Sequence, residues 1–145
     1  MTTDERFMNM ALDEARAALA QDEIPIGAVV VADGMVIGRG HNLTETLHDV
    51  TAHAEMQAIT AAEVYLGGKY LNRCTLYVTV EPCVMGAGAI AWSHLGRLVF
   101  GAKDEKRGYQ RYAPEALHPK TAVVSGVLEE ECAAMMKDFF KVKRR

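Results

Sequence analysis

The segment 75–83 constrains the fold most, because its pattern predicts a strand that leads directly into a helix. Leu76, Val78 and Val80 alternate with their neighbours at the two-residue period of a strand. Pro82 follows at once, and proline is favoured in the first turn of a helix, where its missing N–H is not needed. A strand that passes straight into a helix indicates a sheet with helices packed on it.

Strands and helices are also predicted in the rest of the chain. Apolar spacing predicts helices at 2–21, which Thr2 and Glu5 open as a capping box, and at 51–66, 82–93 and 129–143. Further strands are predicted at 26–31, 35–39, 97–101 and 121–125, with Asp33-Gly34 as a hairpin turn. A short helix is expected around 114–117, inside a long charged loop.

This order of elements predicts an α/β fold, in which helices cover both faces of a sheet and the hairpin at 26–39 is its antiparallel part. A length of 145 residues fits a single domain that spans 1–145. The formal charge of −3 excludes a protein that coats nucleic acid non-specifically through an overall basic surface.

The first residues lack the basic segment and apolar run of a signal peptide, and no stretch approaches the ~18 apolar residues that span a bilayer. We therefore expect a cytoplasmic protein without a membrane partner. Three cysteines are an odd number for a disulfide framework, so reduced thiols are expected. Cys74 and Cys132 are interpreted as small buried thiols, and Trp92 and Tyr77 as packing residues.

His53, Glu55 and Cys83 are the residues that carry chemistry. His53 and Cys83 each fall at the start of a different predicted helix, where exposed N–H groups favour a thiolate and a hydroxide. Imidazole and thiolate are zinc ligands, and zinc with an open position lowers the pKa of its bound water toward ~7. Glu55 is placed to move the proton as a general acid/base. A lone His-x-Glu would indicate only a solvated helix, so the prediction depends on Cys83.

The pattern H-x-E…P-C-x-x-C is the known signature of zinc-dependent nucleobase deaminases, and this chain departs from it at one position. Gly86 stands where the second metal-binding cysteine belongs, three residues after Cys83. A glycine has no side chain that can bind zinc. Three explanations are open, in this order of preference: a substitution introduced or acquired in this chain, a naturally inactive relative, and a site that works with fewer protein ligands.

Segments along nearly the whole chain resemble the bacterial tRNA-specific adenosine deaminases. They lie at 23–31, 41–42, 51–55, 75–79, 81–85, 87–89 and 138–140. The resemblance implies a three-layer α/β/α cytidine-deaminase-like fold with a five-stranded mixed sheet, and a homodimer with active sites near its interface. It also implies one zinc per subunit, and deamination of the wobble adenosine to inosine in a tRNA anticodon stem-loop.

The resemblance also implies roles for individual residues. Asn42 matches a base- and ribose-contacting asparagine, the backbone around Ala54 and Cys83 would hold the flipped base, and Val29 would line its pocket. Asp104 matches an aspartate near the substrate strand, where a carboxylate can accept a hydrogen bond from a ribose 2′-OH. The role of the loop at 106–112 stays open.

The end of the chain is basic and aromatic. Its residues include Phe140, Lys141, Lys143 and Arg144, which by resemblance lie along the anticodon stem-loop. A solvated helix end that complements its own dipole would explain the basic residues equally well. We favour RNA contact.

Gly86 leads to the prediction that this chain binds zinc weakly and deaminates poorly, and that the Gly86→Cys form does both better. Two other functions remain open. One is deamination of a free base or nucleoside such as guanine or cytosine. The other is a non-catalytic RNA-binding relative that keeps the fold without the metal.

Overall fold

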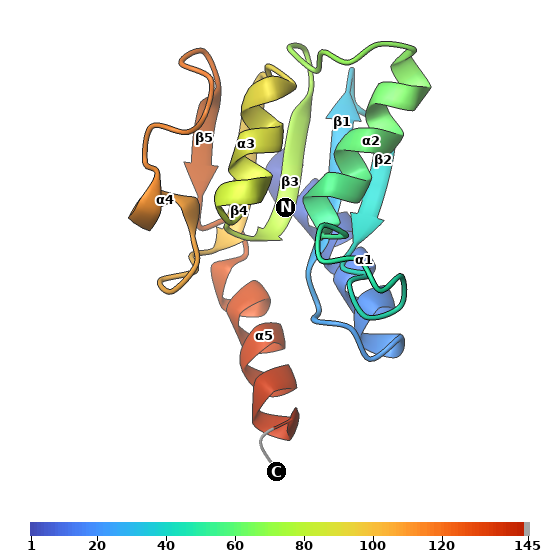
Figure 1. Cartoon of the computed structure of the whole chain (residues 1–145), viewed down its shortest axis with the longest axis vertical. Coiled ribbons are helices and arrows are strands. Elements are labelled where there is room, and N and C mark those ends of the chain that lie inside the picture. The colour runs from blue at the N-terminus through green and yellow to red at the C-terminus, as the bar shows by residue number, and fades with distance from the viewer. Residues whose placement is uncertain (144–145) are drawn as a thin grey trace.

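The structure, a computed structural model, describes residues 1–143 of the 145-residue chain (Figure 1). Its helices are α1 (Thr3–Ala20), α2 (Ala54–Leu66), α3 (Val84–Trp92), α4 (Tyr109–Tyr112) and α5 (Glu129–Lys143). Its strands are β1 (Gly27–Ala32), β2 (Met35–His41), β3 (Thr75–Val80), β4 (Arg97–Ala102) and β5 (Ala122–Ser125). This order of helices and strands is the one that the sequence predicts.

The five strands form one mixed sheet in the order β2-β1-β3-β4-β5. β1 pairs antiparallel with both β2 and β3, whereas β3 pairs parallel with β4, and β4 with β5. Strands β2 to β5 therefore all end at the same edge of the sheet, which is the lower edge in Figure 1. The segments that leave these strands gather there, and this edge carries the candidate site.

Alternating side chains of the central strands feed two separate cores. Val30, Val78 and Phe100 face α2 and α3, while their neighbours Val29 and Tyr77 face α1 and α5. In Figure 1, α2 and α3 lie in front of the sheet and α1 lies behind it. The predicted five-stranded α/β sheet with helices on both faces is confirmed, because each face of the strands is apolar and needs a cover.

Glycines in β2 let α2 pack directly on the sheet. A Cβ on Gly40 would lie 2.7 Å from the Ala58 nitrogen and 2.6 Å from the Gln57 Cβ, and a Cβ on Gly38 would lie 2.8 Å from the Ala62 nitrogen. Any side chain at these two positions would push the helix outward. The glycines therefore help to set the position of α2 and of its first residues.

Several element bounds differ from those that the sequence predicts. α2 begins at Ala54 and α3 at Val84, two or three residues later than predicted, because His53 and Cys83 are N-caps with extended backbone. β2 extends to His41, where it continues its pairing with β1. Among the described residues, no helix is both long and apolar enough to cross a membrane.

The short helix predicted around 114–117 is wrong: it lies at Tyr109–Tyr112. Tertiary contacts decide this position, because Tyr109 is buried and its N–H donates to the Pro82 carbonyl. The Gln110 N–H donates to the Glu81 carboxylate in the same region. No periodicity within 103–120 carries this information.

Candidate functional site

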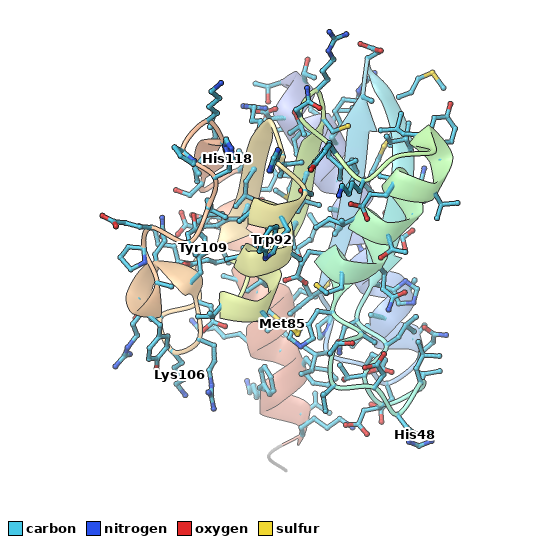
Figure 2. The ribbon with its side chains drawn as sticks, turned by 45° about the horizontal axis from the view of Figure 1, so that its top comes forward. His48, Met85, Trp92, Lys106, Tyr109 and His118 are labelled. Atoms are coloured by element: carbon cyan, nitrogen blue, oxygen red, sulfur yellow. The ribbon has the colours of Figure 1, made fainter. Side chains whose placement is uncertain are left out.

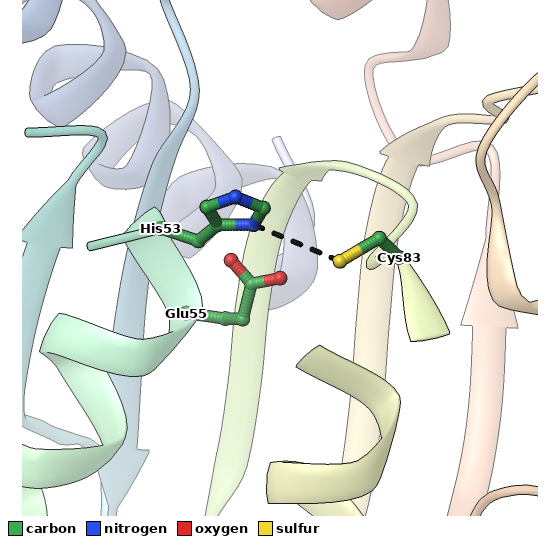
Figure 3. Close-up of side chains that lie close together, drawn as sticks. All are labelled: His53, Glu55 and Cys83. Carbon is green, nitrogen blue, oxygen red and sulfur yellow. Dashed lines mark hydrogen bonds between the residues drawn. The ribbon is translucent and has the colours of Figure 1, made fainter. Parts of the chain in front are cut away.

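His53, Glu55 and Cys83 meet at the sheet edge where β2 and β3 end. His53 precedes α2 and Cys83 precedes α3, and neither side chain caps its own helix through a hydrogen bond. Their side chains are thus free to point toward each other between the two helix starts (Figure 3). The two helix N-termini thus converge on one point, and His53 and Cys83, predicted at the start of two helices, are the N-cap residues of those helices.

The imidazole of His53 and the thiol of Cys83 form a pair, with Nδ1 and Sγ 3.7 Å apart (Figure 3). The hydrogen bond to His53 lowers the pKa of the half-buried Cys83 thiol, and the neighbouring N–H of Gly86 lowers it further. The same hydrogen bond raises the pKa of His53. The lowered pKa of Cys83 favours the thiolate, which is the form that binds a metal, whereas His53 must lose its proton to bind the same ion.

Glu55 is the buried acid of the site, with 4% of its surface exposed. Burial raises the pKa of its carboxyl group. The two other buried glutamates, Glu23 and Glu81, each accept backbone N–H groups, whereas within residues 1–143 no other residue donates a hydrogen bond to the Glu55 carboxylate. A buried carboxyl group that has a raised pKa and no donor besides its own backbone N–H is suited to carry a proton.

These three residues fit a metal ion by chemistry and spacing. One ligand atom from each lies within 4.8 Å of the others. With ordinary zinc bond lengths, two ligands at tetrahedral angles lie about 3.6 Å apart, close to the 3.7 Å between His53 Nδ1 and Cys83 Sγ. A modest side-chain movement would bring the carboxylate to the same spacing.

Gly86 lies against Glu55. A Cβ built on Gly86 would meet the Glu55 Oε2 directly and lie 2.9 Å from Cδ and 3.1 Å from Cγ. The Glu55 carboxyl group thus occupies the space that the first side-chain atom of a cysteine at position 86 would need. Sequence reasoning had identified Gly86 as a missing ligand but not as the residue that makes room for Glu55.

The predicted substrate residue Asn42 is buried and begins a hydrogen-bonded loop, in which the next N–H, that of Leu43, donates to the carbonyl of Ala52 just before His53. Its amide donates to the Glu23 carboxylate at 3.3 Å and to the Thr44 hydroxyl at 3.4 Å. Glu23 also accepts the N–H groups of Glu45 and Thr46. Sequence reasoning missed this role of Glu23, whose only signal was its place in the segment 23–31.

Glu81 holds a second loop in place, the one at 103–112. Its carboxylate accepts the N–H groups of Asp104 and Gln110, and a Cβ on Gly108 would lie 2.5 Å from its Oε1. Asp104, predicted to contact substrate, accepts the N–H groups of Lys106 and Arg107. Cys83 and Gly108 form an isolated bridge. The loop at 103–112 therefore lies against the cysteine of the site, a link that the Glu-Pro-Cys sequence alone does not reveal.

The structure does not bring Val29 to the cluster. Its side chain is 0% exposed and packs in the core on the α1 face, opposite to α2 and α3. The alternation of β1 decides this, since the neighbouring Val30 faces α2. Val29 therefore offers no surface to a substrate. Ala54 is the first residue of α2, between His53 and Glu55, and is buried.

The basic end of the chain lies on α5, which extends beyond the sheet edge in Figure 1. Phe140 and Lys141 are exposed, and the Lys143 Nζ pairs with Asp22 at 2.8 Å. Phe139, Phe140 and Lys143 line a groove of about 490 Å³ whose other wall includes Thr44–Thr46. Figure 2 shows His48 and Lys106 on two loops at this same end. Arg144 lies outside the described residues.

A second groove, of about 360 Å³, lies between α2 and α3. Trp92 is 82% exposed there (Figure 2), so the interpretation of Trp92 as a packing residue is wrong within this chain. Tyr77 is buried as expected. Other apolar side chains exposed along α2 and the loop after it are Val64, Tyr65, Leu66 and Tyr70. Met56, which follows Glu55, lines the groove and connects it to the site.

Within the described residues all three cysteines are free, and Cys74 and Cys132 are buried as expected.

Comparison with known proteins agrees with this geometry. Residues 2–144 match the family of MafB19-like deaminases. The chain is 46% identical to the tRNA-specific adenosine deaminase of Bacillus subtilis (strain 168), over 100% of this chain and 93% of the relative. The chain also matches a solved structure of a tRNA:A34 deaminase, which edits A to I at the wobble position of transfer RNA. The TM-score is 0.84 and the sequence identity is 46%, over 90% of this chain and 98% of that one. A guanine deaminase from Nitrosomonas europaea matches with a TM-score of 0.83 at 27% identity, over 93% and 83%.

Proposed function

This chain belongs to the family of the tRNA-specific adenosine deaminases, hydrolases that act on carbon–nitrogen bonds, and on that premise we propose that it deaminates the wobble adenosine of a tRNA to inosine. We further propose that Gly86 lowers this activity in the chain as it stands. The observation that carries the proposal is the cluster of His53, Glu55 and Cys83 in a chain related to these enzymes along its whole length.

The family is zinc-dependent, and His53 and Cys83 are the residues that would hold the ion. Bound zinc would supply a water molecule whose pKa lies near neutrality. Glu55, with its raised pKa, would take a proton from the attacking water and return it to the ring nitrogen and the departing amine. Adenosine and water thereby become inosine and ammonia. The backbone around Ala54 and the side chains of Asn42 and Asp104 are the proposed substrate contacts, in loops that Glu23 and Glu81 hold in place.

The test measures inosine in an anticodon stem-loop RNA, with the chain as it stands and with Gly86→Cys. Restoring a thiolate that binds the metal should raise turnover at least about 10-fold, since even the loss of a residue that only contacts a metal ligand costs that much. Gly88→Cys is the matched control, because Gly88 lies on the same helix and a Cβ there meets nothing within 4 Å. Absence of inosine with Gly86→Cys would contradict the proposed substrate. Equal turnover of the two chains would contradict the proposed impairment.

We propose that the end of α5 contacts the stem-loop through Phe140, Lys141, Lys143 and Arg144. Lys and Arg contacts to phosphates make binding fall steeply with salt, and aromatic rings stack on splayed loop bases. Phe140→Ala and Lys141→Gln should each weaken stem-loop binding, and Lys141→Gln should also reduce its salt dependence. Lys120→Gln is a control, because Lys120 is an exposed lysine outside α5 and outside both grooves. Equal losses with Lys120→Gln would argue against a defined RNA surface.

A second candidate function is deamination of a free base, which the likeness to the guanine deaminase supports. It predicts release of ammonia from guanine by the Gly86→Cys form and turnover that does not change when residues 139–145 are deleted. A third candidate, a non-catalytic RNA-binding relative, predicts stem-loop binding without metal and without product. Inosine in the stem-loop, ammonia from guanine and binding of the stem-loop, measured together, separate all three.

We propose a homodimer that forms through the groove between α2 and α3. Support comes from the exposed Trp92 and Tyr70, which both line this groove. Large exposed apolar patches of this kind mark protein interfaces. Met56 lies in this groove directly after Glu55, so a partner would sit close to the site.

We also propose that residues 1–145 form one domain. Since the proposed substrate is a tRNA, we propose that the protein acts in the cytoplasm.

A further inference from the structure

We propose that Glu55 is itself a metal ligand in this chain, so that His53, Glu55 and Cys83 bind zinc together and the carboxylate takes the place of the missing thiolate. The inference rests on the zinc site of the proposed function, and it changes the role of one residue in that site.

The first support is the position of Glu55. One of its carboxylate oxygens lies within 4.8 Å of both the His53 nitrogen and the Cys83 sulfur. Its side chain is directed toward the space between the two (Figure 3). A carboxylate oxygen is a common zinc ligand beside histidine, with a bond of about 2.0–2.2 Å. The three side chains therefore offer three ligand atoms of accepted types around one point.

The second support is the lack of any other partner for Glu55. The residue is 4% exposed, and in the range 1–143 no other residue donates a hydrogen bond to its carboxylate. Glu23 and Glu81 are equally buried, but both accept backbone N–H groups. A buried carboxylate whose only donor is its own backbone N–H is unfavourable unless a cation or a proton also compensates it. A bound metal ion would provide that compensation.

The third support is Gly86. The Glu55 carboxyl group lies where a Cβ on residue 86 would be, so this arrangement requires a glycine there. Replacing one thiolate by one carboxylate also keeps two negative charges around the divalent ion. The substitution that removes the thiolate therefore makes room for its replacement.

The consequence is a division between metal binding and catalysis. A carboxylate bound to the ion is no longer free to carry protons, so the chain keeps the metal and loses the general acid/base. Low activity of the chain as it stands would then arise from the changed role of Glu55, with zinc still present.

The test is a double-mutant cycle read out as zinc affinity, by competition with a chromophoric chelator. The four proteins are the chain as it stands, Glu55→Gln, Gly86→Cys, and both changes together. Glu55→Gln should lower zinc affinity at least about 10-fold in the chain as it stands. In the Gly86→Cys background, where the Cβ displaces the carboxylate, the same change should alter affinity less than about threefold, because coupling between contacting residues appears as non-additivity. Glu63→Gln, on the same helix outside the cluster, is the control and should have no effect.

Equal effects of Glu55→Gln in both backgrounds, no effect in either, or no zinc binding by the chain as it stands would each overturn the inference. A second measurement covers the case in which Gly86→Cys does not fold. With Co²⁺ in the chain as it stands, the charge-transfer band of a single thiolate should vanish in Cys83→Ser, and the visible bands should shift in Glu55→Gln. Unshifted visible bands would overturn the inference. Inosine formation plays no part in these readouts: metal binding through Glu55 without inosine from Gly86→Cys would contradict only the proposed function.

Discussion

Glu55 and Gly86, from two different helices, share one small volume at the centre of the site. A Cβ on Gly86 would lie 2.9 Å from the Glu55 Cδ, closer than unbonded carbon atoms approach in folded proteins. The backbone of α3 and the side chain of Glu55 are therefore adapted to each other at this contact. Any side chain at position 86 must move the carboxyl group first.

This contact predicts different effects of adding a methyl group at two glycines of α3. Gly88→Ala should stabilise the protein by up to about 1 kcal/mol, because alanine favours a helix and the added Cβ meets nothing within 4 Å. Gly86→Ala should stabilise it less, because its Cβ displaces the buried Glu55. Chemical denaturation of the two variants measures the difference. Equal gains would show that the Glu55 carboxyl group moves at no cost.

A second prediction concerns the ion pair between α1 and β4. Arg97 donates to both Asp4 oxygens, at 2.8 and 2.6 Å, and the Tyr77 hydroxyl donates to Oδ1 at 2.7 Å. The hydrogen bonds from Arg97, with that from Tyr77, hold the pKa of Asp4 below its ordinary 3.8 although burial opposes this. Asp4→Asn should cost about 1–3 kcal/mol at neutral pH, as for charged hydrogen bonds. Asp13→Asn is the control, because its pair with Arg16 is exposed.

The pH dependence of this pair follows from the direction of the shift. Because the pKa of Asp4 is lower in the folded state, its contribution is fully present above the unfolded pKa near 3.8 and is lost as the pH falls through the folded value. The stability difference between the protein and Asp4→Asn should therefore shrink below about pH 4. Urea denaturation from pH 7 to pH 3 measures it, and a constant difference would contradict the assignment.

A third prediction concerns the loop at 103–112. Glu81 accepts the Asp104 and Gln110 N–H groups, so Glu81→Gln removes a charged acceptor that orders the loop beside Cys83. Amide hydrogen exchange at residues 104–112 should become at least about 10-fold faster, as for a lost interaction of about 1.4 kcal/mol. Glu105→Gln, at an exposed position in the same loop, should leave exchange unchanged. Unchanged exchange in Glu81→Gln would mean that Tyr109 alone anchors the loop.

A fourth prediction concerns the exposed face of α3. Trp92→Glu places a charge at the centre of the proposed dimer interface and should convert the protein to a monomer, because unpaired charges at buried interfaces are costly. Met35→Glu, at an exposed position on the β1–β2 hairpin outside the groove between α2 and α3, should leave the oligomeric state unchanged. Light scattering after gel filtration measures both. A monomer before any substitution would refute the proposed dimer.

The sequence by itself determined the family, the order of the elements and the three residues of the candidate site. Local patterns suffice for these features: the alternation in 75–80 sets strand β3, Thr2 and Glu5 cap α1, and Asp33-Gly34 turns the hairpin. The absence of a cysteine at position 86 is equally visible in the printed sequence.

Only the tertiary structure decided how these pieces meet. Val29 was expected near the substrate but faces the α1 core, because strand pairing sets which side chains of β1 point to which face. The short helix lies at Tyr109–Tyr112 because Glu81 and Pro82, far away in the chain, bind its backbone. Gly86 and Glu55 are 31 positions apart in the sequence. They come into contact because β2 and β3 run in the same direction and end at the same edge of the sheet, so that α2 and α3 begin side by side. Long-range strand pairing sets this arrangement, and no local sequence pattern encodes it.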